Sequence, residues 1–142
     1  MIGRPAAGYR LLPHTADAVV EAWAPTRETC VAEAVRGLVA VFAETAGVVA
    51  SRSVTVTLGP AADDELLLRL LEEVIYLVEV GEMVTVDVQV ALAPDGRASG
   101  RLEVARLRPS MVIGPTPKGV AWHELAFAPE RTGWLCRFTV DV

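Results

Sequence analysis

Two short acidic segments, one near each end of the sequence, carry the residues best suited to chemistry. Pro13 cannot donate a backbone hydrogen bond to a sheet, so it ends an extended run and leaves His14 and Asp17 on a polar bend. The sequence closes on Asp141 and on the terminal carboxylate of Val142, with no basic neighbour. If the fold brings the two segments together, three carboxylates converge. Such a cluster takes up protons or binds a cation, and calcium or magnesium is the kind of cation that prefers oxygen ligands.

Each of these residues also has a structural interpretation. Asp17 could be a turn aspartate that hydrogen-bonds its own bend, and Asp141 could simply be exposed at the end of a strand. His14 could act as a ligand or a base, but an oxygen-preferring ion favours a structural histidine that hydrogen-bonds the bend.

Length and composition predict one compact domain over residues 1–142, because a chain of 142 residues that is 52% hydrophobic can bury a substantial core. A net charge of −5 would repel a phosphate backbone, so we expect no direct binding of nucleic acid. The sequence shows no signal peptide and no apolar run of membrane-spanning length, which predicts a cytoplasmic protein without a membrane partner. Cys30 and Cys136 lack the spacing of a zinc site and are predicted to be buried thiols.

Hydrophobic periodicity predicts a hairpin and two helices in the first half of the chain. Strands over residues 9–12 and 18–24 flank the polar bend. Thr26 is placed to cap a helix over residues 27–45 that has one buried face, and Asp63 or Asp64 to cap a second over 65–80. The other strands are predicted over residues 53–58, 83–92, 97–107, 120–127 and 134–142.

This order of elements indicates an α+β fold: a single domain of about seven strands in a mixed or antiparallel sheet arrangement, with two amphipathic helices packed on it. Strict alternation over 83–92 predicts that Thr85, Asp87 and Gln89 share one side of the strand and that the other side carries Val84, Val86, Val88, Val90 and Leu92. In the last strand the same alternation directs Asp141 away from the core. Residues 109–119, with three prolines and two glycines, are predicted to form a loop. Arginines at 97, 101, 106 and 108 with Lys118 form either a local basic strip or a solvated strand face.

Taken together, these segments resemble the archease family along nearly the whole length of the sequence. The strongest element is His14-Thr15-Ala16-Asp17 after a Tyr-x-Leu-Leu strand. Four further segments support it, in the same order and spacing: the alanine-rich helix that starts at Thr26 and ends near Phe42, residues 70–76 of the second predicted helix, the Lys-Gly-Val-Ala-Trp-His segment over 118–123, and the terminal Asp141-Val142.

The resemblance implies a function and a set of site residues. Archeases assist the RtcB-type RNA ligase in tRNA splicing; they promote guanylylation of the ligase's active-site histidine and allow repeated turnover, without being ligases themselves. The resemblance further implies a divalent-metal site, with calcium expected and magnesium or manganese as alternatives, formed by Asp17, Asp141 and Val142. Lys118 matches the family's lysine, and Glu72 or Glu73 matches an acidic position in its second helix. Lys118 could contact a nucleotide phosphate on the partner or be solvated.

The sequence departs from the family's pattern at three places. Pro13 stands where an aspartate is frequent, Trp122 stands where a tyrosine is usual, and residues 106–116 do not match. The departures spare the predicted metal ligands but put the partner-facing loop in question, so a divergent ligase partner or the loss of that partner stays open. Two other functions therefore stay open: a small metal-dependent hydrolase, and a chaperone-like binding module with a structural divalent ion.

Overall fold

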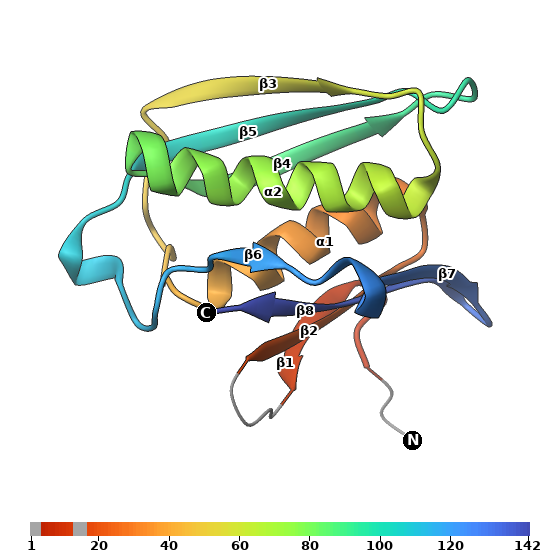
Figure 1. The fold of residues 1–142 in the computed structure, drawn as a ribbon, viewed down its shortest axis with the longest axis horizontal. Helices are drawn as coiled ribbons and strands as arrows, with labels where there is room; N and C mark the ends of the chain where they lie inside the picture. The colour runs from red at the N-terminus through yellow and green to blue at the C-terminus, as the bar shows by residue number, and fades with distance from the viewer. Residues whose placement is uncertain (1–3, 13–16) are drawn as a thin grey trace.

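The computed structural model describes residues 4–12 and 17–142, which form two α-helices and eight strands in three layers (Figure 1). One antiparallel sheet has the order β1-β2-β8-β6, with β7 also paired to β8, and a second has the order β3-β5-β4. Both helices lie between the two sheets (Figure 1). The elements are β1 (Gly8–Leu12), β2 (Ala18–Ala24), α1 (Arg27–Ala40), β3 (Arg52–Leu58), α2 (Asp63–Gly81), β4 (Met83–Leu92), β5 (Ala98–Arg106), β6 (Gly119–Val120), β7 (Ala126–Glu130) and β8 (Gly133–Asp141).

The α+β class is confirmed, but the helices do not simply cover one face of a sheet. Buried residues occur all round α1: Cys30, Val31, Ala32, Ala34, Val35, Gly37, Leu38 and Val39. The single stripe predicted for this helix is too narrow because α1 packs against the first sheet on one side and β4 on the other. At Gly37 a Cβ atom would lie 2.5 Å from Val20 Cγ1, so the close approach of α1 to β2 requires glycine.

The start of α1 follows the prediction and its end does not. The Thr29 backbone N–H donates to Thr26 Oγ1 at 3.2 Å, so Thr26 is the N-cap. The helix ends at Ala40 rather than at residue 45, because the following chain pairs elsewhere: the N–H of Glu44 donates to the carbonyl of Met111 at 2.8 Å. The segment after α1 is thereby joined to the loop that follows β5.

The second helix begins two residues earlier than predicted and without the predicted cap. Its N-cap is Ala62, which offers no side-chain hydrogen bond. Asp63, instead of capping α2, accepts two hydrogen bonds from Arg27 Nη1, at 2.9 and 3.1 Å. This ion pair ties the beginnings of the two helices together.

Strand β4 carries a β-bulge that breaks the predicted alternation. Thr85 lies opposite Val104 of β5 and Asp87 lies opposite Glu103, so Val86 is an extra residue on the β4 side. Cross-strand partners share a face, and Val104 is fully buried, so Thr85 is turned inward. The expectation that Thr85 shares a side with Asp87 and Gln89 is therefore wrong.

The stretch predicted as one strand over 120–127 is interrupted. A 3-10 helix, η2 (Trp122–Glu124), separates β6 from β7, and both strands pair with β8. Residues 109–119 are largely a loop, as expected, with a second 3-10 helix, η1 (Pro109–Met111). Within the described residues, no helix is long and apolar enough to cross a membrane.

The two cysteines are buried, as predicted, but they also meet. Cys30 Sγ on α1 lies 3.2 Å from Cys136 Sγ on β8. The hydrogen bond from Cys136 lowers the pKa of Cys30, and the same bond together with burial raises the pKa of Cys136. Their separation of 106 residues leaves no sign of this contact in the sequence.

Candidate metal centre and partner surface

Strand pairing places the two predicted metal-binding aspartates at the same end of the first sheet. Ala18 is the first residue of β2, and its partner in β8 is Val140. Asp17 directly precedes this pair and Asp141 directly follows it, so the two aspartates lie at adjacent strand ends. The chain terminus lies beside them, at the end of β8 (Figure 1). His14 and Thr15 lie outside the described residues.

The oxygen atoms at this point suit a hard cation. Asp17 is half-buried and Asp141 is exposed, and among the described residues no lysine, arginine or histidine forms an ion pair with either one. The described part of the chain has no cluster of three His, Cys, Asp or Glu side chains that could hold a metal. The sequence predicts the carboxylate of Val142 as the third ligand, and the half-buried side chain of Val142 packs against the core. Two aspartates and a terminal carboxylate form a donor set typical of calcium and magnesium ligands.

Lys118 lies on the neighbouring strand edge. Its backbone N–H donates to the carbonyl of Asp141 at 2.7 Å, and the next residue, Gly119, is the β-sheet partner of Asp141. Residue 118 is thus fixed through its main chain to the end of β8, while its side chain is exposed. The long loop before β6 therefore ends next to the two aspartates.

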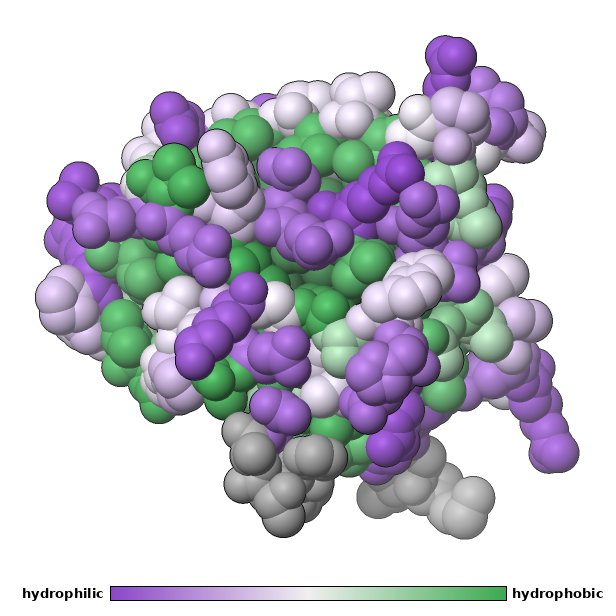
Figure 2. All heavy atoms as spheres, viewed as in Figure 1, coloured by the Kyte–Doolittle hydropathy of each residue, from purple (hydrophilic) through white to green (hydrophobic). Residues whose placement is uncertain are grey.

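The predicted acidic residues of the second helix share a groove with Lys118. This groove, of about 280 Å³, runs between α2 and β6 and is lined by Glu72, Glu73, Ile75, Tyr76, Glu79, Lys118 and Gly119. The structure thus brings three of the predicted partner-binding residues together. Figure 2 shows hydrophilic side chains over this side of the molecule, with apolar ones between them.

Sequence reasoning missed Tyr76 as a member of this groove. Tyr76 is 55% exposed although it is large and aromatic, whereas seven aliphatic residues of the same helix are buried. The signal is present in the sequence: Tyr76 follows Glu72 and Glu73 by four and three residues, which places all three on one helix surface. Exposed aromatic residues such as Tyr76 are enriched at protein-binding surfaces.

The arginines of the second sheet do not form a free basic strip. Arg101 pairs with Glu103 at 2.7 Å, Arg106 pairs with Glu82 at 3.2 Å, and Arg97 pairs with Asp95 at 3.5 Å. Each of these three arginines has an acidic neighbour, as on an ordinary solvated strand face.

One histidine position also differs from expectation. The strand predicted over residues 120–127 would set His123 on the same side as Leu125 and Phe127, in the packed interior. It lies instead in η2, with its side chain 80% exposed and its Nε2 3.6 Å from a carboxylate oxygen of Glu124. The 3-10 turn rotates the residue out of the strand alternation.

Sequence comparison decides the family. Residues 9–142 match the model of the archease protein family (MTH1598/TM1083). The chain belongs to the archease family. It is 37% identical over 142 residues to the probable protein archease of Mycobacterium tuberculosis, covering 99% of this chain and 79% of that protein. It is 28% identical over 136 residues to the protein archease of Archaeoglobus fulgidus, covering 94% and 98%.

Solved structures support the fold. Protein 1598 of Methanobacterium thermoautotrophicum superposes with a TM-score of 0.78 at 18% identity, over 95% of this chain and 99% of that chain. An archease and possible chaperone from Thermotoga maritima (TM1083) superposes with a TM-score of 0.63 at 13% identity, over 100% and 98%. At these identities the likeness establishes the arrangement of helices and strands.

Proposed function

We propose that this protein is a metal-binding accessory protein, not itself an enzyme, that activates an RtcB-type RNA ligase in tRNA splicing and RNA repair. In this proposal it promotes guanylylation of the ligase and so allows multiple turnover. A ligase partner of this kind implies that the protein functions in the cytoplasm, as the sequence predicts. Membership of the archease family is the first support.

The observation that carries the proposal is the register of β2, β8 and β6. It sets Asp17 beside Asp141 and ties Lys118 to Asp141 through a 2.7 Å main-chain hydrogen bond. Residues that are far apart in sequence, and that the family resemblance singles out, thus occupy one end of one sheet.

Asp17, Asp141 and the carboxylate of Val142 would hold the ion, with calcium expected and magnesium or manganese as alternatives. A bound divalent cation neutralises these carboxylates. The protein's own residues then act by position: β2 and β8 hold the two aspartates, and Asp141 holds the start of β6. Lys118 is thereby held in the groove between α2 and β6 that it lines, where a ligase surface could meet Glu72, Glu73 and the Lys118 ammonium.

The test is the rate of ligase guanylylation from GTP and manganese, measured with the RtcB-type ligase of the same source. The wild-type chain should accelerate the step, and Asp17→Ala and Asp141→Ala should abolish the acceleration. Asp95→Ala, at an exposed turn between β4 and β5, is the matched control and should act as wild type. An active ligase that the wild-type chain does not accelerate would refute the proposal.

A chaperone-like binding module is the second candidate, because the related protein of Thermotoga maritima is described as a possible chaperone. A general chaperone would suppress the aggregation of unrelated unfolded proteins, and Asp17→Ala would retain that activity. Loss of suppression in Asp17→Ala, or its absence in wild type, would count against this candidate.

A further inference from the structure

Two thiols meet in the core between α1 and the first sheet. Cys30 Sγ lies 3.2 Å from Cys136 Sγ, and both residues are fully buried. Cys136 of β8 pairs with Ala22 of β2, and Cys30 Sγ also lies 3.6 Å from the carbonyl oxygen of Ala22. The S–S bond of a disulfide measures about 2.05 Å, so the two sulfur atoms would have to approach by only about 1 Å to form one.

The pair is separate from the sites described above, and its composition limits what it can do. These are the only two cysteines in the sequence, and neither lines the groove that contains Lys118. Two thiolates are too few to hold a zinc ion, and within the part of the chain that the structure describes no third His, Cys, Asp or Glu joins them. The chemistry that remains for two sulfur atoms in contact is a bond between them.

The two thiols are not equivalent. The hydrogen bond from Cys136 lowers the pKa of Cys30, whereas the same bond together with burial raises the pKa of Cys136. Cys30 is also the fourth residue of α1, close to the N-terminal end whose partial positive charge favours a thiolate. Because the thiolate is the nucleophilic form, Cys30 is the attacking thiol and Cys136 is the second, resolving thiol.

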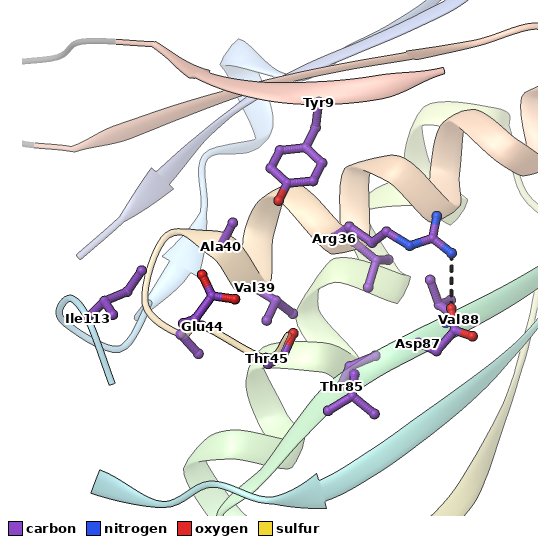
Figure 3. Close-up of a pocket in the computed structure, with 13 residues that line it drawn as sticks. Tyr9, Arg36, Val39, Ala40, Glu44, Thr45, Thr85, Asp87, Val88 and Ile113 are labelled. Carbon is purple, nitrogen blue, oxygen red and sulfur yellow. Dashed lines mark hydrogen bonds and ion pairs between the residues drawn. The ribbon is translucent and has the colours of Figure 1, made fainter. Parts of the chain in front are cut away.

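Burial restricts which oxidant can reach the pair. A cavity of about 210 Å³ lies between β1, α1 and β4, where Figure 3 shows Tyr9, Arg36 and Asp87 around it, and neither cysteine lines this cavity. An oxidant must therefore enter through local opening of the packing around the start of α1. Hydrogen peroxide is little larger than water and can use small openings, whereas Ellman's reagent and glutathione disulfide are far larger.

We propose that Cys30 and Cys136 are a peroxide-sensitive thiol pair that forms an intramolecular disulfide between α1 and β8. This inference does not rest on the proposed ligase activation. It assigns a modification site to the interior of the protein.

The reaction has two steps and needs no reactant besides peroxide. The Cys30 thiolate attacks one oxygen of hydrogen peroxide; an S–O bond forms, the O–O bond breaks, and the departing hydroxide takes the proton that the Cys30 thiol gave up. Cys136 sulfur then attacks the sulfur of the Cys30 sulfenic acid; the S–S bond forms, the S–O bond breaks, and the departing hydroxide takes the Cys136 proton. Two thiols are oxidised to one disulfide and one peroxide is reduced to two waters.

The disulfide would join α1 to the strand that ends at Asp141, across a separation of 106 residues. A cross-link over so long a separation strongly restricts the unfolded chain. The oxidised protein should therefore unfold at a Tm higher by on the order of 10 °C. Because the sulfur atoms already touch, the strands should keep their register in the oxidised form.

The test treats the native full chain with a small excess of hydrogen peroxide, unfolds it in urea with N-ethylmaleimide and maps its peptides by mass spectrometry. We expect that neither cysteine takes up N-ethylmaleimide and that the Cys30 and Cys136 peptides are linked within one molecule. Dithiothreitol should separate the peptides and remove the rise in Tm.

Two variants test the roles of the thiols. Cys136→Ala removes the resolving thiol, so the Cys30 sulfenic acid should persist and label with dimedone at least about tenfold more than in wild type. The matched control combines Cys30→Ala with Thr29→Cys, which moves the thiol to the neighbouring, exposed position. It keeps two cysteines without their contact and should show neither the linked peptides nor the rise in Tm.

The peptide map of the wild type decides the proposal without any variant. Native wild type that keeps both thiols free under peroxide would overturn it, and so would linked peptides that join two molecules rather than one. The same intramolecular bond in the Thr29→Cys control would also overturn it, because the bond would then not depend on the contact between α1 and β8.

Discussion

The candidate metal centre predicts that replacing Asp141 by asparagine has opposite effects on stability with and without calcium. Without a divalent cation, Asp17 and Asp141 are two carboxylates at adjacent strand ends, and among the described residues they have no cationic side chain as partner. Like charges in this arrangement repel, so Asp141→Asn should stabilise the metal-free protein. With calcium bound, the same change removes a ligand and should destabilise it.

The magnitudes follow from the placement of the two residues. A like-charge pair on neighbouring strands costs about 0.2–1 kcal/mol, which is the expected gain of Asp141→Asn without calcium. Calcium at 100 times its Kd should add about 2.7 kcal/mol to the free energy of unfolding of the wild type. For a domain of this size, that corresponds to a rise in Tm of about 10 °C, most of which the variant should lose.

Thermal unfolding in EDTA and in excess calcium measures both effects on the same samples. Asp95→Asn, at the exposed turn after β4, should shift Tm equally in the two conditions. Adding one alanine after Val142 displaces the terminal carboxylate and should reduce the calcium-induced shift. An Asp141→Asn protein that keeps the full calcium shift, or a wild type that shows none with calcium, magnesium or manganese, would refute the assignment of these ligands.

Three further predictions concern the packing. Gly37→Ala should lower the free energy of unfolding by about 1–3 kcal/mol in urea titration, because its Cβ would overlap Val20, whereas Gly81→Ala meets only an ordinary contact and should raise it by about 0.5–1 kcal/mol. The thiols of Cys30 and Cys136 should resist Ellman's reagent in the native protein and react fully in urea; fast native labelling would contradict their burial. Thr85→Val should raise the free energy of unfolding by about 1 kcal/mol, because it removes a buried hydroxyl that has no hydrogen-bond partner among the described residues; a loss in urea titration would contradict this.

Local signals in the sequence are enough to predict most helices and strands, but not how these elements stack into layers. The Thr26 cap and the β4 and β8 segments depend on neighbouring residues, and the sequence predicts them within a residue or two. The sandwich of two sheets around the helices depends on contacts such as β2 with β8, whose paired residues are more than one hundred positions apart. The same long-range packing ends α1 early, because the chain after Ala40 pairs with residues 111–113.

The interior of β4 shows where periodicity fails for a physical reason. Alternation assumes one residue for one residue across the ladder, and a bulge adds a residue without any change in composition. Val86 is as good a strand residue as Val84 or Val88, so nothing in the sequence marks it as the extra one. Alternation therefore sets Thr85 on the side of Asp87 and Gln89, although the bulge turns it inward.

The residue types of the candidate metal centre can be predicted from the sequence, but whether the residues come together cannot. Carboxylates at a bend and at a chain end suggest a cation from the sequence alone, but only the β2–β8 register determines whether they lie together.

The two aspartates of the candidate metal centre are not held equally firmly by the fold. Asp141 belongs to β8, which pairs with β2, β6 and β7 and whose inward side chains Cys136, Phe138 and Val140 are fully buried. Asp17 is a bend residue outside β2, so an ion held by both would join the bend before β2 to the end of β8.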